Sequence, residues 1–311
     1  NPENQELENL QRGPGDEARI SSNVVQVIFQ DRDQNIWVGT PHGLNLFEET
    51  TGSFKRFLTD FDTGIENVVS ICNGEGNNIW LGTNGGLVNF NTKNFTYNVF
   101  LHVEGNPKSL GSNQINIVYR DPSGNLWVGS KDDGISLVTN WEGKQGQIIS
   151  FSNQPSDENS LSNDDVRTIF QDRSGVMWFG TFGGGVNRAN PATRAFGRLK
   201  HNPEDLNTIA SDQIVSLAFD PVRKSLWIGT LNAGLDQMNL ETGEFTHFRH
   251  IPGDENSLNG DNVNLLYVSI RGDLYVGTQG GILQTYDEDL LGFVPAKSMP
   301  DTEEDVRTTT A

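Results

Sequence analysis

Residues 171–187, QDRSGVMWFGTFGGGVN, carry the pattern that decides the fold. A polar turn at residues 172–175 leads into a short apolar strand containing Trp178, and a glycine-rich turn separates that strand from the next. Two close copies occur, QDRDQNIWVGTPHGLN at residues 30–45 and RDPSGNLWVGSKDDGIS at residues 120–136. The chain therefore repeats one structural unit.

One aromatic residue anchors each copy. The six anchors are Trp37, Trp80, Trp127, Trp178, Trp227 and Tyr275. By subtraction of consecutive positions they lie 43 to 51 residues apart, and a period of that length built from short strands is typical of a β-propeller. The fourth copy offers four strand-like runs, at residues 166–171, 176–180, 185–189 and 195–200. The sequence thus predicts an all-β propeller of four-stranded blades, six- or seven-bladed, with six recognisable repeats.

The conserved positions of the repeat have structural explanations. The anchor is flat and bulky, so we expect it to fill the wedge between blades. The glycine two residues later, Gly180 in the fourth repeat, allows a neighbouring blade to approach closely. The hydroxyl of Thr181 is expected to bond to the turn backbone, and Gly185 permits a positive φ before the third strand.

The pattern resembles a known family. Residues 28–45 and 169–187 are similar to the two-component regulator propeller repeat, with departures in the turns of the second, fifth and sixth copies. The resemblance extends over about residues 20–290 and implies the extracytoplasmic sensor region of a bacterial two-component signalling protein. That implies a periplasmic or extracellular domain in a membrane-anchored parent, which can carry a histidine kinase.

Composition excludes several partners. The 311 residues include 22 Lys and Arg against 41 Asp and Glu, a net charge of -19. A nucleic-acid-binding protein needs a positive footprint, and an anionic membrane surface would repel this chain. No 18-residue apolar run exists, so no direct membrane insertion is expected. The single cysteine, Cys72, is expected to be a free buried thiol on an inner strand.

The domain plan follows from the repeats, which predict one closed domain. We expect a leading tail or inter-blade loop at residues 1–20, the propeller at residues 21–300, and a further repeat or tail at residues 301–311. The blades are expected near residues 22–59, 66–103, 113–151, 165–200, 213–249 and 262–294. Blade three carries an insertion at residues 140–146. Apolar runs such as residues 24–29 and 214–219 are predicted to be inner strands buried on both faces.

The ends of the chain suggest a longer array. Residues 304–308 align with residues 164–168, where blade four begins, and residues 1–4 resemble an inter-blade loop. We therefore expect the segment 305–311 to extend along the edge of a blade.

No catalytic or metal-binding motif emerges. His247 and His250 are close in sequence but fall on an outer strand and its exit, so a solvated pair is expected rather than a metal site. Residues 31–35 superficially resemble a calcium loop but lack its central glycine and distal glutamate, which favours an Asp-stabilised turn. No cofactor is expected.

The loops between the second and third strands of each blade are the candidate ligand-binding positions. Their residues differ from repeat to repeat, whereas the Thr or Ser before the loop and the Gly after it recur. Amides, a lysine, acids and an exposed aromatic ring suit an oligosaccharide. The candidates are His42, Asn84, Lys131, Asp132, Phe182, Asn232 and Gln279.

Three functions stay open on the sequence. A non-enzymatic sensor that binds an oligosaccharide or a partner domain fits best. A polysaccharide-active enzyme would require a cluster of His, Tyr, Arg and acids. A platform for protein–protein contacts, including propeller–propeller or homodimer contacts, would present an exposed apolar patch.

Overall fold

The computed structural model describes residue 11 and residues 18–59, 63–142, 145–189, 195–269, 271–279 and 281–296. Of the expected tail at residues 1–20, residues 1–10 and 12–17 lie outside the described residues, as does the expected segment 301–311, including 305–311. Within the described ranges the chain forms only strands, turns and loops, and no helix with the length and hydropathy of a membrane span.

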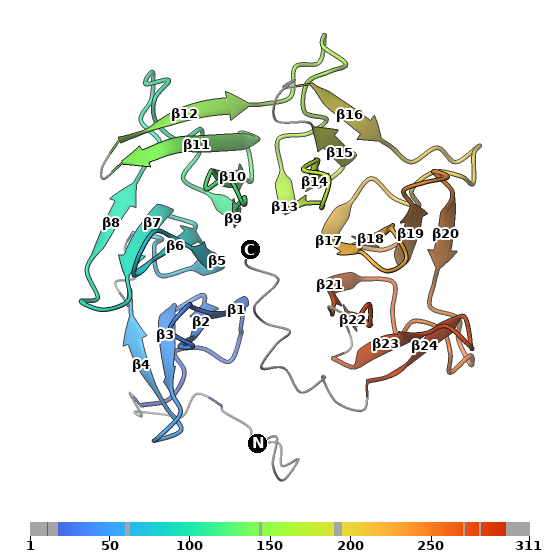
Figure 1. Ribbon diagram of the computed structural model, residues 1–311, viewed down its shortest axis with the longest axis horizontal. Helices are drawn as coiled ribbons and strands as arrows, with labels where there is room; N and C mark the ends of the chain where they lie inside the picture. The colour runs from blue at the N-terminus through green and yellow to red at the C-terminus, as the bar shows by residue number, and fades with distance from the viewer. Residues whose placement is uncertain are drawn as a thin grey trace. The chain divides into compact units, whose positions relative to one another are not determined.

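Six antiparallel sheets of four strands each make up the described structure, and in every sheet the strands follow chain order (Figure 1). The first three sheets are β1 (Val27–Gln30), β2 (Ile36–Thr40), β3 (Gly43–Glu48) and β4 (Ser53–Phe57); β5 (Val68–Asn73), β6 (Asn78–Thr83), β7 (Gly86–Asn91) and β8 (Tyr97–Phe100); β9 (Ile115–Arg120), β10 (Leu126–Ser130), β11 (Ile135–Glu142) and β12 (Gln145–Phe151). The other three are β13 (Val166–Gln171), β14 (Met177–Thr181), β15 (Gly185–Ala189) and β16 (Phe196–Leu199); β17 (Ile214–Asp220), β18 (Ser225–Thr230), β19 (Leu235–Asn239) and β20 (Phe245–Phe248); β21 (Val263–Val268), β22 (Leu274–Thr278), β23 (Leu283–Asp287) and β24 (Gly292–Pro295). The predicted fold class, an all-β propeller, is confirmed, with six described blades.

The blades fall into two compact units, where the sequence led us to expect one closed domain. The first contains the described residues up to Ser150 and the second those from Phe151 onward. In blade three, the expected insertion extends the strands instead, because β11 continues to Glu142 and β12 begins at Gln145.

The anchors hold neighbouring blades together within each unit. Trp37 is fully buried and packs edge-on against Phe90 of the next blade, with ring centroids 5.5 Å apart. In the second unit Trp227 contacts Tyr286 of blade six at 5.5 Å. Burying large aromatic surface between sheets is the main stabilisation that such short strands can obtain.

The repeat glycines and hydroxyls behave as predicted. A Cβ on Gly180 would lie 2.6 Å from Ile214 of the next blade, so only glycine allows that approach. Thr181 donates its hydroxyl to the Gly185 carbonyl at 2.9 Å, and Gly185 has a φ of 75°. These positions build the blades.

The first inner strand differs from its prediction. Ile28 is 66% exposed, and Val24 and Val25 are also exposed, so residues 24–29 are not buried on both faces. Within the first unit β1 packs against β5 on one side only. In contrast β17 lies between β13 and β21 in the second unit, and residues 214–219 are buried or half-buried as predicted.

Candidate functional site

The predicted loop residues of the first unit lie at the end of the blades where the second and third strands join. Asn84, Lys131 and Asp132 are exposed there, whereas His42 is half-buried. The loop backbones are fixed to the loop before the same blade, since the Lys131 amide donates to the Gln114 carbonyl at 3.0 Å. The side chains of Lys131 and Asp132 are therefore presented to solvent on an ordered frame.

The corresponding residues of the second unit are Phe182, Asn232 and Gln279. Asn232 is exposed, and Gln279 accepts a hydrogen bond from the Asn262 side chain at 3.0 Å. Phe182 is half-buried, and the guanidinium of Arg167 lies over its ring at 4.9 Å. One face of this ring is thus already occupied by a cation of the same blade.

The Asp turns at the other end of the blades are structural. Asp31 Oδ2 accepts the indole N–H of Trp37 at 2.8 Å, and Asp31 Oδ1 accepts the amide N–H groups of Asp33 and Asn35. Asp121 and Asp172 repeat the indole bond at 3.0 and 2.9 Å. Sequence reasoning expected an Asp-stabilised turn but missed the indole. Among the described residues no group of three His, Cys, Asp or Glu could hold a metal ion.

Four histidines hydrogen-bond to loop or blade groups, and the expectation of a solvated pair is corrected for His247, which is half-buried, whereas His250 is exposed. His250 Nδ1 contacts the carbonyl of Leu258, eight residues later, at 2.7 Å. His102 and His201 contact the carbonyls of Leu110 and Ile209 in the same way. His247 lies 2.7 Å from the buried carboxylate of Asp236 and 2.8 Å from the Leu206 carbonyl. Because both ring nitrogens of His247 are engaged, this side chain belongs to the packing of blade five.

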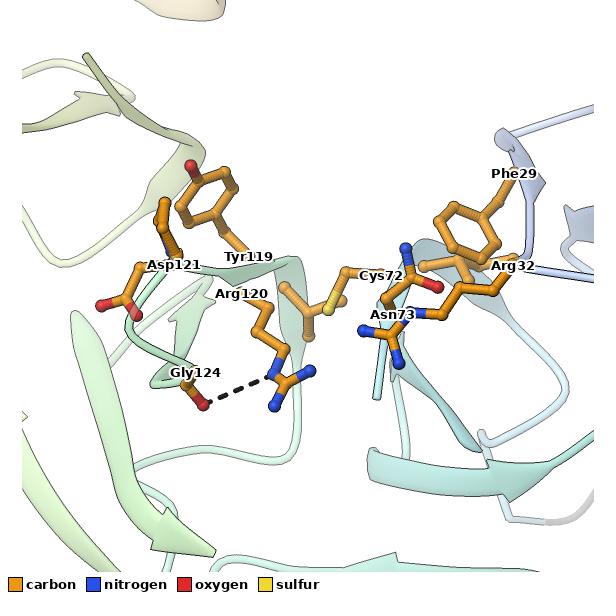
Figure 2. Close-up of a pocket in the computed structure, with 11 residues that line it drawn as sticks. Phe29, Arg32, Cys72, Asn73, Tyr119, Arg120, Asp121 and Gly124 are labelled. Carbon is orange, nitrogen blue, oxygen red and sulfur yellow. Dashed lines mark hydrogen bonds between the residues drawn. The ribbon is translucent and has the colours of Figure 1, made fainter. Parts of the chain in front are cut away.

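A cavity of about 420 Å³ opens at the Asp-turn end of the first unit (Figure 2). Its walls come from three consecutive inner strands, through Phe29 of β1, Cys72 of β5 and Tyr119 of β9. Two arginines, Arg32 and Arg120, also line it, together with Ile71, Asn73, Val118, Asp121, Pro122 and Gly124. None of the seven loop residues predicted from the sequence lines this cavity.

The arginines of the cavity differ in how they are held. Arg120 donates to the Gly74 carbonyl at 3.0 Å, to Gly124 at 3.4 Å and to the exposed carboxylate of Glu75 at 3.4 Å. Arg32 is exposed and has no hydrogen bond or ion pair to the described part of the chain. Figure 2 shows the two guanidinium groups extending into the same space from opposite walls, while the Asp121 carboxylate points away.

The thiol in this cavity is not a nucleophile. Burial raises the pKa of Cys72 to about 12, although Arg120 acts in the opposite direction. A thiol with this pKa stays protonated at neutral pH, and the thiolate is the reactive form. Cys72 therefore shapes the cavity, and the expected free thiol on an inner strand is confirmed.

A signal for the cavity was present in the sequence. The strand pairing places six residues opposite the anchors: Phe29, Cys72, Tyr119, Phe170, Ala218 and Tyr267. Four of these are aromatic, and two are small: Cys72, between Phe29 and Tyr119, and Ala218, between Phe170 and Tyr267. Without the pairing register these exceptions could not be recognised.

Comparison with known proteins defines the class. Residues 19–42, 109–132 and 160–183 match the two component regulator propeller. These three segments of the β-propeller are two component regulator propeller repeats, and the resemblance expected from residues 28–45 and 169–187 is confirmed.

A curated relative is Histidine kinase P4 of Formosa agariphila, which is 34% identical to this chain over 182 residues. The alignment covers 57% of this chain and 13% of the kinase, so the chain spans a small part of that relative's length.

Solved structures share the fold. PorZ, a bacterial surface component of the type-IX secretion system of Porphyromonas gingivalis, is 18% identical with a TM-score of 0.63 over 84% of this chain and 38% of that chain. The β-propeller domain of Cps50 (Swd1) from Myceliophteria thermophila is 14% identical, with a TM-score of 0.60 over 88% of this chain and 87% of that chain. An extracellular domain assigned to a hybrid two component system of B. thetaiotaomicron is 16% identical, with a TM-score of 0.48 over 94% of this chain and 50% of that chain.

Proposed function

We propose that this chain is the non-enzymatic, extracytoplasmic ligand-recognition propeller of a bacterial two-component signalling protein. The observation that carries the proposal is the match of three segments to the two component regulator propeller. The 34% sequence identity to a histidine kinase over 182 residues supports it. A histidine kinase activity would reside elsewhere in the parent protein. Signal transfer then requires that the ligand bind one state of the parent more tightly than another.

The ligand proposed for this sensor is an oligosaccharide bound at the loop end of the blades. Within the first unit, support comes from the exposed side chains of Asn84 and Lys131 on ordered loops; within the second unit, it comes separately from exposed Asn232 and the ring of Phe182. Amides and charges hydrogen-bond sugar hydroxyls, and an aromatic ring stacks on the apolar face of a sugar. The Arg167 guanidinium over Phe182 leaves only the other face of the ring for that stacking.

Calorimetry against a panel of oligosaccharides tests this proposal. The double variant Phe182→Ala with Asn232→Ala should weaken binding about tenfold or more, with an unchanged melting temperature. Thr242→Ala is the control, because Thr242 is exposed at the opposite end of the blade-five sheet. Absence of binding to every oligosaccharide, or equal affinities for the double variant and the wild type, would contradict the assignment.

A propeller–propeller contact is a second proposal, favoured by one surface feature. Tyr97 and Val99 of the outer strand β8, with Leu101 and Val103 after it, are all exposed at alternate positions. A row of apolar side chains on an edge strand invites pairing with another chain. We propose that a second copy pairs here. Sedimentation velocity should show a dimer that Val99→Lys abolishes, and a monomeric wild type across the concentration range would reject the contact.

A further inference from the structure

The cavity of the first unit lies beside one small side chain. At the position opposite the anchor, β1 carries Phe29 and β9 carries Tyr119, but β5 carries Cys72. The missing ring leaves a space bounded by two aromatic side chains (Figure 2). Its volume of about 420 Å³ falls within the range of small-molecule sites, roughly 300–1,000 Å³.

The charged groups aimed into this space are cationic, and the neutral amide of Asn73 also lines it. Asp31 and Asp121, the nearest turn carboxylates, are bound to their own turns and indoles. Asp33, next to Arg32, is paired instead with Lys93 at 3.0 Å. Arg32 consequently offers its guanidinium N–H groups to the cavity, in a protein whose net charge is -19.

The second arginine holds a position that blades one and four fill with glutamine, while the other three blades carry Asn73, Phe219 and Val268 there. Gln30 and Gln171 occupy the same register position, and each donates its amide to a carbonyl of its own turn. Arg120 keeps that bond through Nε, to the Gly124 carbonyl, and adds a positive charge that lines the cavity and is paired only with the exposed carboxylate of Glu75, at 3.4 Å, among the described residues. The turn does not need this charge, since the glutamine copies fold without it.

We propose that this cavity is a binding site for small ring compounds that carry a carboxylate. The carboxylate lies between Arg32 and Arg120, because guanidinium groups bind carboxylates through paired, charge-assisted hydrogen bonds. The ring lies between Phe29 and Tyr119, in the space that Cys72 leaves open. Sugar acids and aromatic acids share this chemistry.

The site is separate from the oligosaccharide site proposed above and does not depend on it. The cavity is at the Asp-turn end of the first unit, whereas Phe182 and Asn232 are in loops of the second unit. Phe182→Ala with Asn232→Ala should leave carboxylate binding unchanged, so each proposal can fail without the other.

Two matched pairs of probes test the chemistry by titration calorimetry. D-glucuronate is compared with D-glucose, and benzoate with benzyl alcohol. At least one carboxylate should bind about tenfold or more tightly than its neutral partner, the factor expected from charge-assisted bonds. The pair that shows the difference identifies the source as sugar acids or aromatic acids. Equal or absent binding of both carboxylates and their neutral partners would overturn the proposal.

Variants locate the binding. Arg32→Gln and Arg120→Gln should each weaken carboxylate binding about tenfold or more, and Arg120→Gln restores the residue that the repeat uses in blades one and four. Arg173→Gln is the control, because Arg173 holds the position of Arg32 in the turn of blade four. Cys72→Phe should fill the cavity and abolish binding. An equal effect of Arg173→Gln, or arginine variants that bind like the wild type at an unchanged melting temperature, would overturn the proposal even if Cys72→Phe failed to fold.

Discussion

The bond between Asp31 and the Trp37 indole should be a major stabiliser of the first blade. Asp31 is 8% exposed and Trp37 is fully buried. In Asp31→Ala the indole N–H loses its acceptor at 2.8 Å, and water cannot replace that acceptor at a buried site. Leaving a buried donor unsatisfied costs about 1–3 kcal/mol.

The turn amides add a smaller contribution. Asp31 Oδ1 also accepts the N–H groups of Asp33 and Asn35, at 2.9 and 3.0 Å. Asp33 is exposed and Asn35 half-buried, so water can take over part of this function. Their loss adds about 0.5–1.5 kcal/mol. We expect Asp31→Ala to lower the free energy of unfolding by about 1.5–4.5 kcal/mol in total.

Urea denaturation followed by circular dichroism measures the effect. Asp33→Ala is the matched control in the same turn, because Asp33 makes only an exposed pair with Lys93; exposed pairs contribute about 0–1 kcal/mol. In a Trp37→Phe background, which lacks the indole N–H, Asp31→Ala should lose only the turn contribution. The reasoning is refuted if Asp31→Ala is no more destabilising than Asp33→Ala, or if its effect is the same in both backgrounds.

Three further measurements follow from the fold. Trp178→Ala should lower the stability by about 3–5 kcal/mol, and an unchanged melting temperature would contradict its role between blades four and five. Gly180→Ala should lower stability by about 1–3 kcal/mol through contact with Ile214, whereas Gly260→Ala, whose Cβ would have nothing closer than 3.8 Å, should change it little; equal effects would exclude the close approach as the reason for glycine. Burial raises the pKa of Cys72 from 9.0 to about 12, so the folded state retains the thiol proton more strongly than the unfolded chain does. That contribution is complete below pH 9 and is lost as the pH rises from 9 toward 12, by up to about 1.4 kcal/mol per pH unit; Cys72→Ala should lack this component, and identical pH profiles for wild type and variant would count against a buried thiol.

The sequence by itself determined the repeating fold. The anchors recur at one position of the repeat. The glycines and hydroxyl residues around Trp178 have local geometric roles, and equivalent residues recur in the other repeats. Short-range requirements of this kind, a positive φ at Gly185 or a turn closed by Asp172, can be deduced from neighbours in the chain. The propeller class and the resemblance to the two component regulator propeller repeat therefore followed from the sequence.

The tertiary structure decided which apolar side chains are exposed and where a cavity forms. Ile28 has the apolar pattern of a buried strand, but its exposure depends on whether another sheet packs on that face of β1. The gap at Cys72 exists only because Phe29 and Tyr119 come from neighbouring blades, and Arg32 and Arg120, 88 positions apart by subtraction, line it together. Packing between segments distant in sequence sets burial and cavity shape, and no local pattern in a single repeat contains that information.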